Sequence, residues 1–331
     1  MKALFRTVSI ALVFLAGALP LCLQAQAIRG PVLGLVADPE GTVVRPLLGV
    51  PGASSVGEPL LLNARVRRVQ VSPRQDYLLA LRNEDKAVVL FDLAADTFSA
   101  RSLAFPGVAD LISISPSGSA AAIYDAVTRR VYTIAGLPGN PGAVHGFNAS
   151  QILGHVTALS VTDDGALALL RSERSDEEQT RAESSVIGES GLSWRVPSDD
   201  AAVAFVAGRR DIVVADNLTR SVFLVTDLGR TYARRPLFTP ADDSERFSGV
   251  ATSANALRVF VTTQSGAVAI MEMLTGQLTW LSCECRPTTL DPLKGTSLFR
   301  LTEGSSTEPI IALDASADEP RFVMTPPNTE Q

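Results

Sequence analysis

The sequence predicts an all-β fold, and three observations lead to it. Short apolar or alternating runs recur along the whole chain between polar turns, which is the pattern of strands. A shared strand–turn–strand unit has its opening turns near Ser72, Ser115, Thr162, Ala207, Ser253 and Asp291, at spacings of 43, 47, 45, 46 and 38 residues. No helical periodicity separates the strands. A repeat of roughly 40 to 50 residues matches one four-stranded blade, so the predicted fold is a β-propeller.

The units follow one another without a Pro-rich or Ser-rich linker. A short first unit has strands expected at 32–36 and 42–48, around the turn 38–41. Full units follow with strands at 77–81 and 87–93, 120–124 and 131–134, 166–170, 211–215 and 221–225, 257–261 and 267–270, and 297–301 and 309–313. Six full units and the short one predict seven four-stranded blades. Stacked β-sandwiches would fit the length but would not require this repetition.

The first unit is short of strands, which raises the question of how the ring closes. One further strand-like run, 321–325, lies between Pro320 and Pro326 near the end of the chain. Exposed sheet edges are liabilities, so we expect this run to pair with a strand between residues 31 and 48 and to close the ring with strands from both termini. The alternative is that it completes the last blade as its outer strand.

The first 27 residues have the three parts of a signal peptide. Lys2 and Arg6 are basic, residues 10–23 are almost entirely apolar, and 25–27 are a small-x-small cleavage site. We predict cleavage after Ala27, a secreted or periplasmic location, and a single propeller domain over 28–331. A membrane anchor is disfavoured because the apolar run is short of roughly 20 residues. Lipidation of Cys22 is disfavoured because Leu21 precedes it.

Charge and cysteine usage narrow the class of partner. The net charge of −6 argues against nucleic-acid binding, and no later stretch is long and apolar enough to span a membrane. After cleavage, Cys283 and Cys285 remain. Residues i and i+2 of a strand share a face about 6.6 Å apart, so a disulfide needs a local bend. An oxidising compartment favours that disulfide over a metal site with two ligands. We expect a monomer without a cofactor.

Two stretches carry a resemblance to a known superfamily. They are Phe260-Val261-Thr262-Thr263-Gln264-Ser265-Gly266 and Val213-Val214-Ala215-Asp216-Asn217, while Asp92 and Asp227 match the aspartate that ends a unit. The chain resembles the seven-bladed propellers of the YVTN-repeat, lactonase-like and WD40-like superfamily over nearly all of its mature length. The resemblance implies the fold, and no catalytic residue is carried over from it.

Motifs that would indicate catalysis are scarce. The two histidines, His145 and His155, are interpreted as loop or strand-edge residues, and the sequence has no nucleophile elbow and no phosphate loop. Three carboxylate pairs occur in predicted turns, at 163–164, 199–200 and 242–243. A calcium site or an acid–base pair is one interpretation of these pairs. Turn-forming hydrogen bonds to backbone N–H groups are the favoured one.

A polar insertion interrupts the fourth unit between residues 171 and 184. It contains the charged residues Arg174, Asp176, Glu177, Glu178 and Arg181. Insertions on repeat proteins lie on one face and carry function more often than cores do, so these five residues are a candidate interaction loop. The alternative is a solvated hairpin. Because it has no apolar anchor, we expect it to be the most mobile part of the mature chain.

Two functions remain compatible with the sequence. The first is a non-catalytic scaffold that binds a protein or a cell-envelope component on one propeller face. The second is a lactonase-like hydrolase with its site at the central channel, which only the resemblance supports. Three or more carboxylates, histidines or arginines meeting at the channel mouth would favour the hydrolase, and a channel of small or apolar residues would favour the scaffold.

Overall fold

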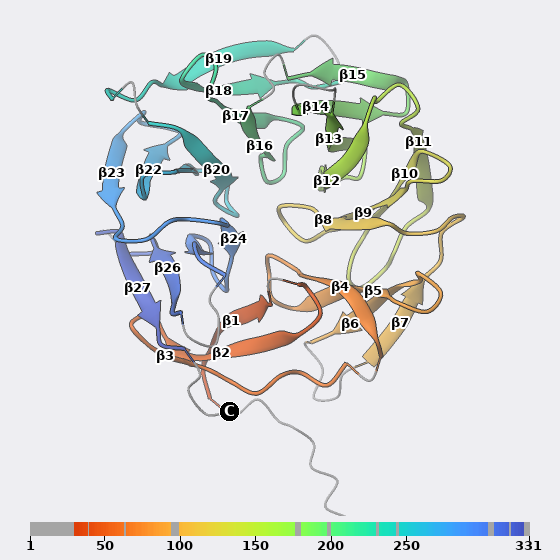
Figure 1. The fold of residues 1–331 in the computed structure, drawn as a ribbon, viewed down its shortest axis with the longest axis horizontal. Helices are drawn as coiled ribbons and strands as arrows, with labels where there is room; N and C mark the ends of the chain where they lie inside the picture. Colours follow the sequence, from red (N-terminus) through yellow and green to blue (C-terminus); the bar gives the residue numbers. More distant parts are fainter. Residues whose placement is uncertain are drawn as a thin grey trace, which may run out of the picture.

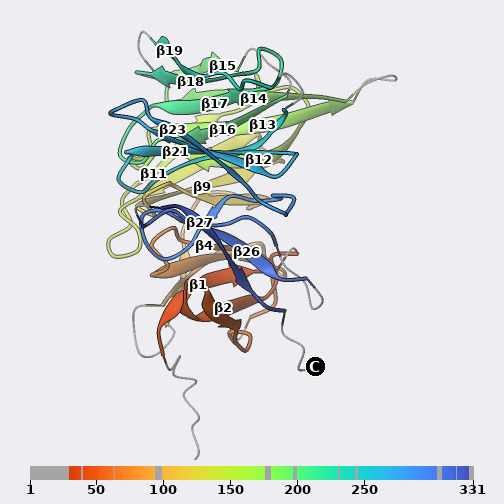
Figure 2. The same cartoon turned by 90° about the vertical axis from the view of Figure 1, so that its left-hand side faces the viewer.

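The computed structural model describes residues 30–38, 40–62, 64–93, 99–175, 180–196, 200–229, 232–242, 245–303, 308–317 and 319–327. Within this part of the chain all regular elements are β-strands, and they form seven antiparallel sheets. The sheets stand as blades around a central axis in one closed ring (Figure 1). Seen from the side, the sheets lie one above another (Figure 2). The predicted seven-bladed β-propeller is confirmed.

Each sheet is contiguous in sequence. The first consists of β1 (Val32–Ala37), β2 (Val44–Val50) and β3 (Ala53–Val56), and the second of β4 (Val66–Val71), β5 (Tyr77–Arg82), β6 (Val88–Asp92) and β7 (Ser99–Leu103). The third has β8 (Leu111–Ile114), β9 (Ala120–Asp125), β10 (Arg130–Ala135) and β11 (Val144–Asn148), and the fourth has β12 (His155–Val161), β13 (Leu167–Ser175), β14 (Thr180–Gly188) and β15 (Gly191–Arg195). The fifth comprises β16 (Ala201–Phe205), β17 (Ile212–Asp216), β18 (Ser221–Thr226) and β19 (Ala233–Phe238). The sixth comprises β20 (Phe247–Thr252), β21 (Arg258–Thr263), β22 (Ala267–Glu272) and β23 (Leu278–Ser282), and the seventh β24 (Asp291–Pro292), β25 (Leu298–Arg300), β26 (Ile310–Asp314) and β27 (Arg321–Thr325).

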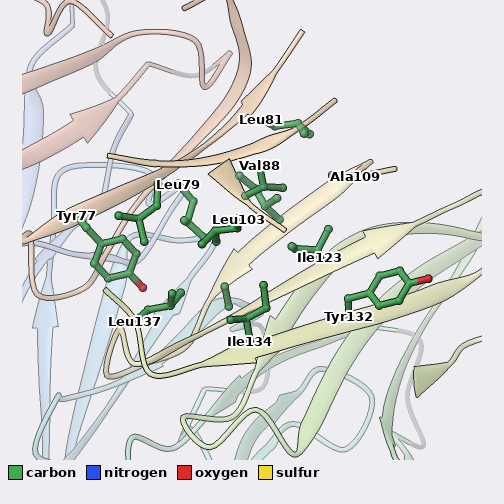
Figure 3. Packing of buried hydrophobic residues seen from close by; sticks show 13 residues of the cluster. Tyr77, Leu79, Leu81, Val88, Leu103, Ala109, Ile123, Tyr132, Ile134 and Leu137 are labelled. Carbon is green, nitrogen blue, oxygen red and sulfur yellow. The ribbon is translucent and has the colours of Figure 1, made fainter. Parts of the chain in front are cut away.

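The core lies between neighbouring sheets. The middle strands of a blade are apolar on both faces, because one face packs against the preceding sheet and the other against the following one. In β5, Tyr77, Leu79 and Leu81 are fully buried on the face toward the third sheet. Figure 3 shows these side chains facing Ile123 and Ile134 of the third sheet. Burying one such aliphatic side chain contributes about 1.5–3 kcal/mol, so the ring is held by the contacts between successive blades.

Polar side chains in the turns also join successive sheets. Asp163, after β12, accepts hydrogen bonds from Ser117 N at 2.8 Å and from Gly208 N at 2.5 Å, which connects the third, fourth and fifth sheets. Asn217, after β17, bonds both main-chain groups of Phe247 in the next sheet, with its Nδ2 3.0 Å from the carbonyl oxygen and its Oδ1 2.6 Å from the nitrogen. These side chains fix the spacing of the blades.

The first sheet differs from the others in the direction of its inner strand. Lys294 N donates to Leu33 O at 3.0 Å, and Arg300 Nη1 donates to Ala37 O at 2.9 Å. Because Arg300 also pairs with Asp291 at the start of β24, β1 runs antiparallel to β24. Elsewhere innermost strands run parallel, as for β16 and β20, whose last residues are joined from Thr252 Oγ1 to Phe205 O at 3.4 Å.

The reversed direction shows which strand of a blade β1 represents. In sheets two to seven the innermost strand is followed by a second, antiparallel one. With its opposite direction, β1 corresponds to a second strand, and β2 and β3 correspond to a third and an outer strand. Within the described residues, the first sheet therefore has three strands and lacks an innermost one.

Gln75 takes over part of the missing strand's role. Its side chain accepts from Leu35 N at 2.6 Å through Oε1 and donates to Pro292 O at 3.0 Å through Nε2. One amide group thus bonds β1 on one side and β24 on the other, as the peptide group of an inner strand would. The seam is completed by an apolar cluster in which Leu33, Val36 and Leu47 of the first sheet pack with residues of the seventh.

The run 321–325 does not pair with the first sheet, and that prediction is wrong. β27 pairs with β26 through its whole length and is the outer strand of the seventh sheet, the alternative that the sequence left open. A short connection follows β26, so a local hairpin forms rather than a distant pairing. The ring nevertheless closes between N-terminal and C-terminal strands: Thr325 Oγ1 lies 2.6 Å from Ser54 Oγ of β3.

Candidate functional site: a charged cavity in the central channel

A cavity of about 470 Å³ occupies the side of the channel where the first sheet lacks its innermost strand. It is lined by strands β1, β4 and β24, by the end of β8, and by the charged residues Asp38, Glu40, Arg67, Arg68, Asp291, Arg300 and Glu303. A second cavity of about 310 Å³ lies against sheets four, five and six, where Ala158, Ser160, Ala202 and Gly249 are among the lining residues. The first cavity is thus rich in charged residues, whereas the second has one charged residue, Arg171, among apolar, small and hydroxyl-bearing ones.

On β1, every second residue directs its N–H and C=O groups toward the charged cavity instead of toward β2. Leu35 and Ala37 are these residues, because their partners in β2, Pro46 and Val44, use their carbonyl groups to bond residues that follow β3. Gln75 occupies Leu35 N and Arg300 occupies Ala37 O. In the described part of the chain, Leu35 C=O and Ala37 N–H are left without a hydrogen-bond partner. Strand β1 therefore presents one free acceptor and one free donor on the same edge.

Several charged groups of the cavity are used in structural bonds. Asp38 accepts from Thr42 N at 2.6 Å and from Val43 N at 2.8 Å, which closes the turn after β1. Arg300 pairs with Asp291 at 2.5 Å. Arg67 donates to the carbonyl of Ala109 in the third sheet. Arg300 also bonds Ala37 across the seam, whereas Asp38 closes a local turn and Arg67 reaches the residues ahead of β8.

Other groups of the cavity are uncommitted. Arg68, Glu40 and Glu303 are exposed, and among the described residues none of them has a hydrogen bond or an ion pair. In addition, the Nε atoms of Arg67 and Arg300 are buried without a partner. These two Nε atoms are closed off from solvent, so the exposed guanidinium of Arg68 is the group that offers donors to an acidic ligand.

The predicted interaction loop forms a regular hairpin in the structure. β13 and β14 pair as far as Arg174↔Arg181 and Ser175↔Thr180, and the hairpin reaches beyond the neighbouring sheets (Figure 2). Asp176, Glu177 and Glu178 lie outside the described residues. Since β13 and β14 are the second and third strands of their sheet, the hairpin is separate from the charged cavity.

The two cysteines form a disulfide in the sixth sheet. Cys283 and Cys285 have Cα atoms 5.0 Å apart, directly after β23. Their carbonyl oxygens lie against Gly266, where an added Cβ would come within 2.4 Å of Cys285 O and 2.7 Å of Cys283 O. Gly266 also has a φ of 96°, so both the lack of space for a Cβ and the backbone conformation require glycine in this turn. The disulfide lies in a tight turn outside the cavity.

Among the described members of the carboxylate pairs, Asp164 serves its own turn, Asp163 joins neighbouring sheets and Asp200 forms an ion pair. Asp164 accepts from Ala166 N at 3.0 Å and pairs with Arg210 Nε at 2.7 Å. Burial raises the pKa of this carboxyl, but the hydrogen bonds from Ala166, Thr162 and Arg210 lower it further, and the pKa lies below its usual value. Asp200 pairs with Arg246 at 2.5 Å. Asp199 and Asp243 lie outside the described residues.

The histidines are far apart in the topology. His145 lies on β11, the outermost strand of the third sheet, and His155 begins β12, the innermost strand of the fourth. In the ranges that the structure describes, no three His, Cys, Asp or Glu residues are grouped so that they could hold a metal ion. Nor does a helix in those ranges have the length and apolarity needed to cross a membrane.

Comparisons with known proteins relate the chain to others by fold. No family model matches the sequence, and no curated protein matches it. A crystal structure of a functionally unknown protein from Desulfotomaculum acetoxidans is similar, with a TM-score of 0.53 and 11% identity over 90% of this chain and all of the other. Hydrazine synthase of Kuenenia stuttgartiensis (TM-score 0.46, 12% identity, 92% and 99% covered) and a chain of the mitotic checkpoint complex (0.48, 14%, 89% and 89%) are less similar. The likeness to the Desulfotomaculum acetoxidans protein supports the fold and carries no activity.

The sequence patterns did not predict the cavity. The two strands expected around the turn 38–41 had no assigned positions within a blade, and in the structure that turn follows a strand equivalent to a second one. A signal was present: Val36-Ala37-Asp38 repeats Val214-Ala215-Asp216, which ends the second strand of the fifth sheet. Aligning those triplets would have placed the first expected strand second in its blade and predicted an unfilled position in the channel.

Proposed function

We propose that this protein is a non-catalytic binding scaffold whose ligand enters the charged cavity of the central channel. The observation that carries the proposal is that some charged groups of the cavity are held in structural contacts and others are not. Asp38 closes the turn after β1, and Arg300, paired with Asp291, bonds Ala37 across the seam. The side chains of Arg68, Glu40 and Glu303 line the cavity without a partner among the described residues. Groups of this kind recognise a ligand by charge and hydrogen bonding. None of the three is joined to a second titratable group as in an activated nucleophile.

The proposed setting is outside the cytoplasm. The basic start, the apolar run and the cleavage site at 25–27 support export, and the pair Cys283–Cys285 suits an oxidising compartment. The ligand is accordingly a protein or another cell-envelope component, bound by a monomeric propeller. The resemblance to YVTN-repeat and WD40-like propellers fits a binding role but specifies no ligand.

A lactonase-like hydrolase is the second candidate, and one observation favours it. The cavity brings two uncommitted carboxylates, Glu40 and Glu303, to the same side of the channel as three arginines. Charged groups meeting there are what a hydrolase would need. Glu40→Gln and Glu303→Gln would abolish hydrolysis of lactone or ester substrates if either carboxylate acted as an acid or a base.

The two functions are separated by one pair of experiments on the mature protein. Purified protein is assayed against a panel of lactones and esters, and is used as bait in an extract of the exporting cell, with Arg68→Glu as the cavity variant. Arg235→Glu, on the exposed outer strand β19, is the matched control. The scaffold predicts no turnover and a partner that Arg68→Glu loses and Arg235→Glu retains. Turnover abolished by Glu40→Gln or Glu303→Gln would establish the hydrolase instead.

A further inference from the structure

We propose that the charged cavity binds an extended peptide segment of a partner protein, which adds to the edge of β1 in place of the absent innermost strand. This inference rests on the proposed scaffold function and names its ligand class. Six sheets have an innermost strand, and the first has none within the described residues. The cavity of about 470 Å³ lies where that strand would stand.

The free main-chain groups define how the peptide binds. Leu35 C=O and Ala37 N–H face the cavity without a partner, while Leu35 N and Ala37 O are bonded to Gln75 and Arg300. In a parallel pair, one residue donates to the carbonyl before its neighbour and accepts from the N–H after it. A single peptide residue opposite Val36 therefore satisfies both free groups. In an extended peptide parallel to β1, the residues on either side take the places of the Gln75 amide and the Arg300 guanidinium on the same edge, so both side chains move aside on binding.

The side chains of the cavity select the sequence of the peptide. The Arg68 side chain is exposed at the cavity and has no partner among the described residues. An acidic residue of the peptide pairs with Arg68, because charge-assisted bonds to guanidinium are stronger than neutral ones. Glu40 and Glu303 stand in the same lining and favour a neutral or basic residue beside the acidic one.

We take the occupant to be a second protein, and this choice rests on the predicted signal peptide. The predicted cleavage after Ala27 would leave two residues ahead of Gly30, which is fewer than a strand requires. A peptide from a partner obtains main-chain bonds from the edge of β1 and specificity from Arg68, the general mode of strand addition.

The test uses the mature protein and a labelled, capped heptapeptide of alternating valine and threonine with a central aspartate. Binding is measured by fluorescence anisotropy, and hydrogen–deuterium exchange follows residues 32–38. One control peptide has lysine for aspartate, and another is N-methylated at the central residue. Two protein variants, Ala37→Pro and Arg68→Glu, are compared with Arg235→Glu. Because Ala37 N–H faces away from β2, proline there removes the free donor and keeps the ladder.

The proposal predicts slowed exchange of the Ala37 amide with the aspartate peptide, because the other amides of β1 are bonded to β2 or to Gln75 already. It also predicts an at least tenfold higher Kd for the N-methylated peptide and for Ala37→Pro, an at least fivefold higher Kd for Arg68→Glu, and a change within twofold for Arg235→Glu. It is overturned if the aspartate peptide does not bind, if the N-methylated peptide binds within twofold, or if the Ala37 amide is already protected without peptide. Should Ala37→Pro fail to fold, the N-methylated peptide decides. A partner that depends on Arg68 together with a failed peptide test would leave the scaffold standing and remove this inference alone.

Discussion

Gln75 is the residue on which closure of the ring depends most directly. It lies in the turn after β4 with a φ of 62°, a conformation that side chains other than glycine seldom adopt. The bonds from its amide to Leu35 and Pro292 connect the second, first and seventh sheets. A single side chain thus joins three blades at the point where the regular strand pattern is interrupted.

Replacing Gln75 with alanine should weaken the seam. The change leaves Leu35 N and Pro292 O without partners, so we expect the free energy of unfolding to fall by about 1–3 kcal/mol. Urea denaturation followed by circular dichroism measures it. Gln151→Ala, at an exposed position, is the matched control and should change stability by less than about 0.5 kcal/mol. An effect no larger than that of the control would refute the role of Gln75.

Asp125 should contribute to stability in a pH-dependent way. Burial raises the pKa of this carboxyl, but hydrogen bonds from Thr128, Val108 and Val127 outweigh it, so the pKa is lowered in the folded protein. A lowered folded pKa gives stability that is present above the unfolded value of about 3.9 and is lost as the pH falls through the folded pKa.

Asp125→Asn tests that contribution. The variant cannot gain a proton in acid, so its stability should fall less steeply than that of the wild type between about pH 5 and pH 2. At pH 7 the variant should be the less stable of the two, since an amide accepts these backbone bonds more weakly than a carboxylate does. Parallel acid-dependence curves for the two proteins would contradict the assignment.

At the scale of elements, β27 completes the seventh sheet and touches the first. Deleting residues 319–331 removes its ladder with β26, the buried side chain of Val323 and the Ser54–Thr325 contact. We expect a loss of about 3 kcal/mol or more and aggregation through the exposed edge of β26. Thermal melting and light scattering measure both, and a truncated protein as stable and soluble as the full chain would show that β27 is dispensable.

The β13–β14 hairpin should be the first site of proteolysis. Two strands that extend past their sheet have no third strand to stabilise them, and Arg174 and Arg181 face each other near the end of the ladder. Brief trypsin treatment should therefore cut beside one of these two residues, with mass spectrometry identifying the fragments. First cuts within β5, β9 or β17 would show that the hairpin is the better protected element.

At the scale of the whole molecule, the sequence was sufficient for the repeat but not for the seam. Alternating strands and turn residues depend on local chemistry, so residues such as Asp163 and Asn217 could be placed in turns between strands. Those side chains bond residues of neighbouring sheets 30 to 46 positions away, as in Asn217 with Phe247 and Asp163 with Ser117. How the first and last sheets meet depends on residues more than 200 positions apart, such as Gln75 with Pro292. Local patterns carry no information on such pairs.

The predicted signal peptide concerns the whole molecule as well, because it decides what precedes β1. Expression with export should yield a mature protein that begins Ile28-Arg29-Gly30, as read by mass spectrometry of the N-terminus. Mutating Ala25 and Ala27 to bulky residues should block processing. An exported protein that still begins at Met1 would contradict the cleavage site and the argument that the channel position is free for a partner.

A crystal structure of the mature protein would test whether the first sheet lacks an innermost strand. We expect seven sheets in a closed ring, with β1 antiparallel to β24, Gln75 bridging Leu35 and Pro292, and no fourth strand on the inner edge of β1. A first sheet whose innermost strand comes from this same chain, with Gln75 turned away from the seam, would contradict it.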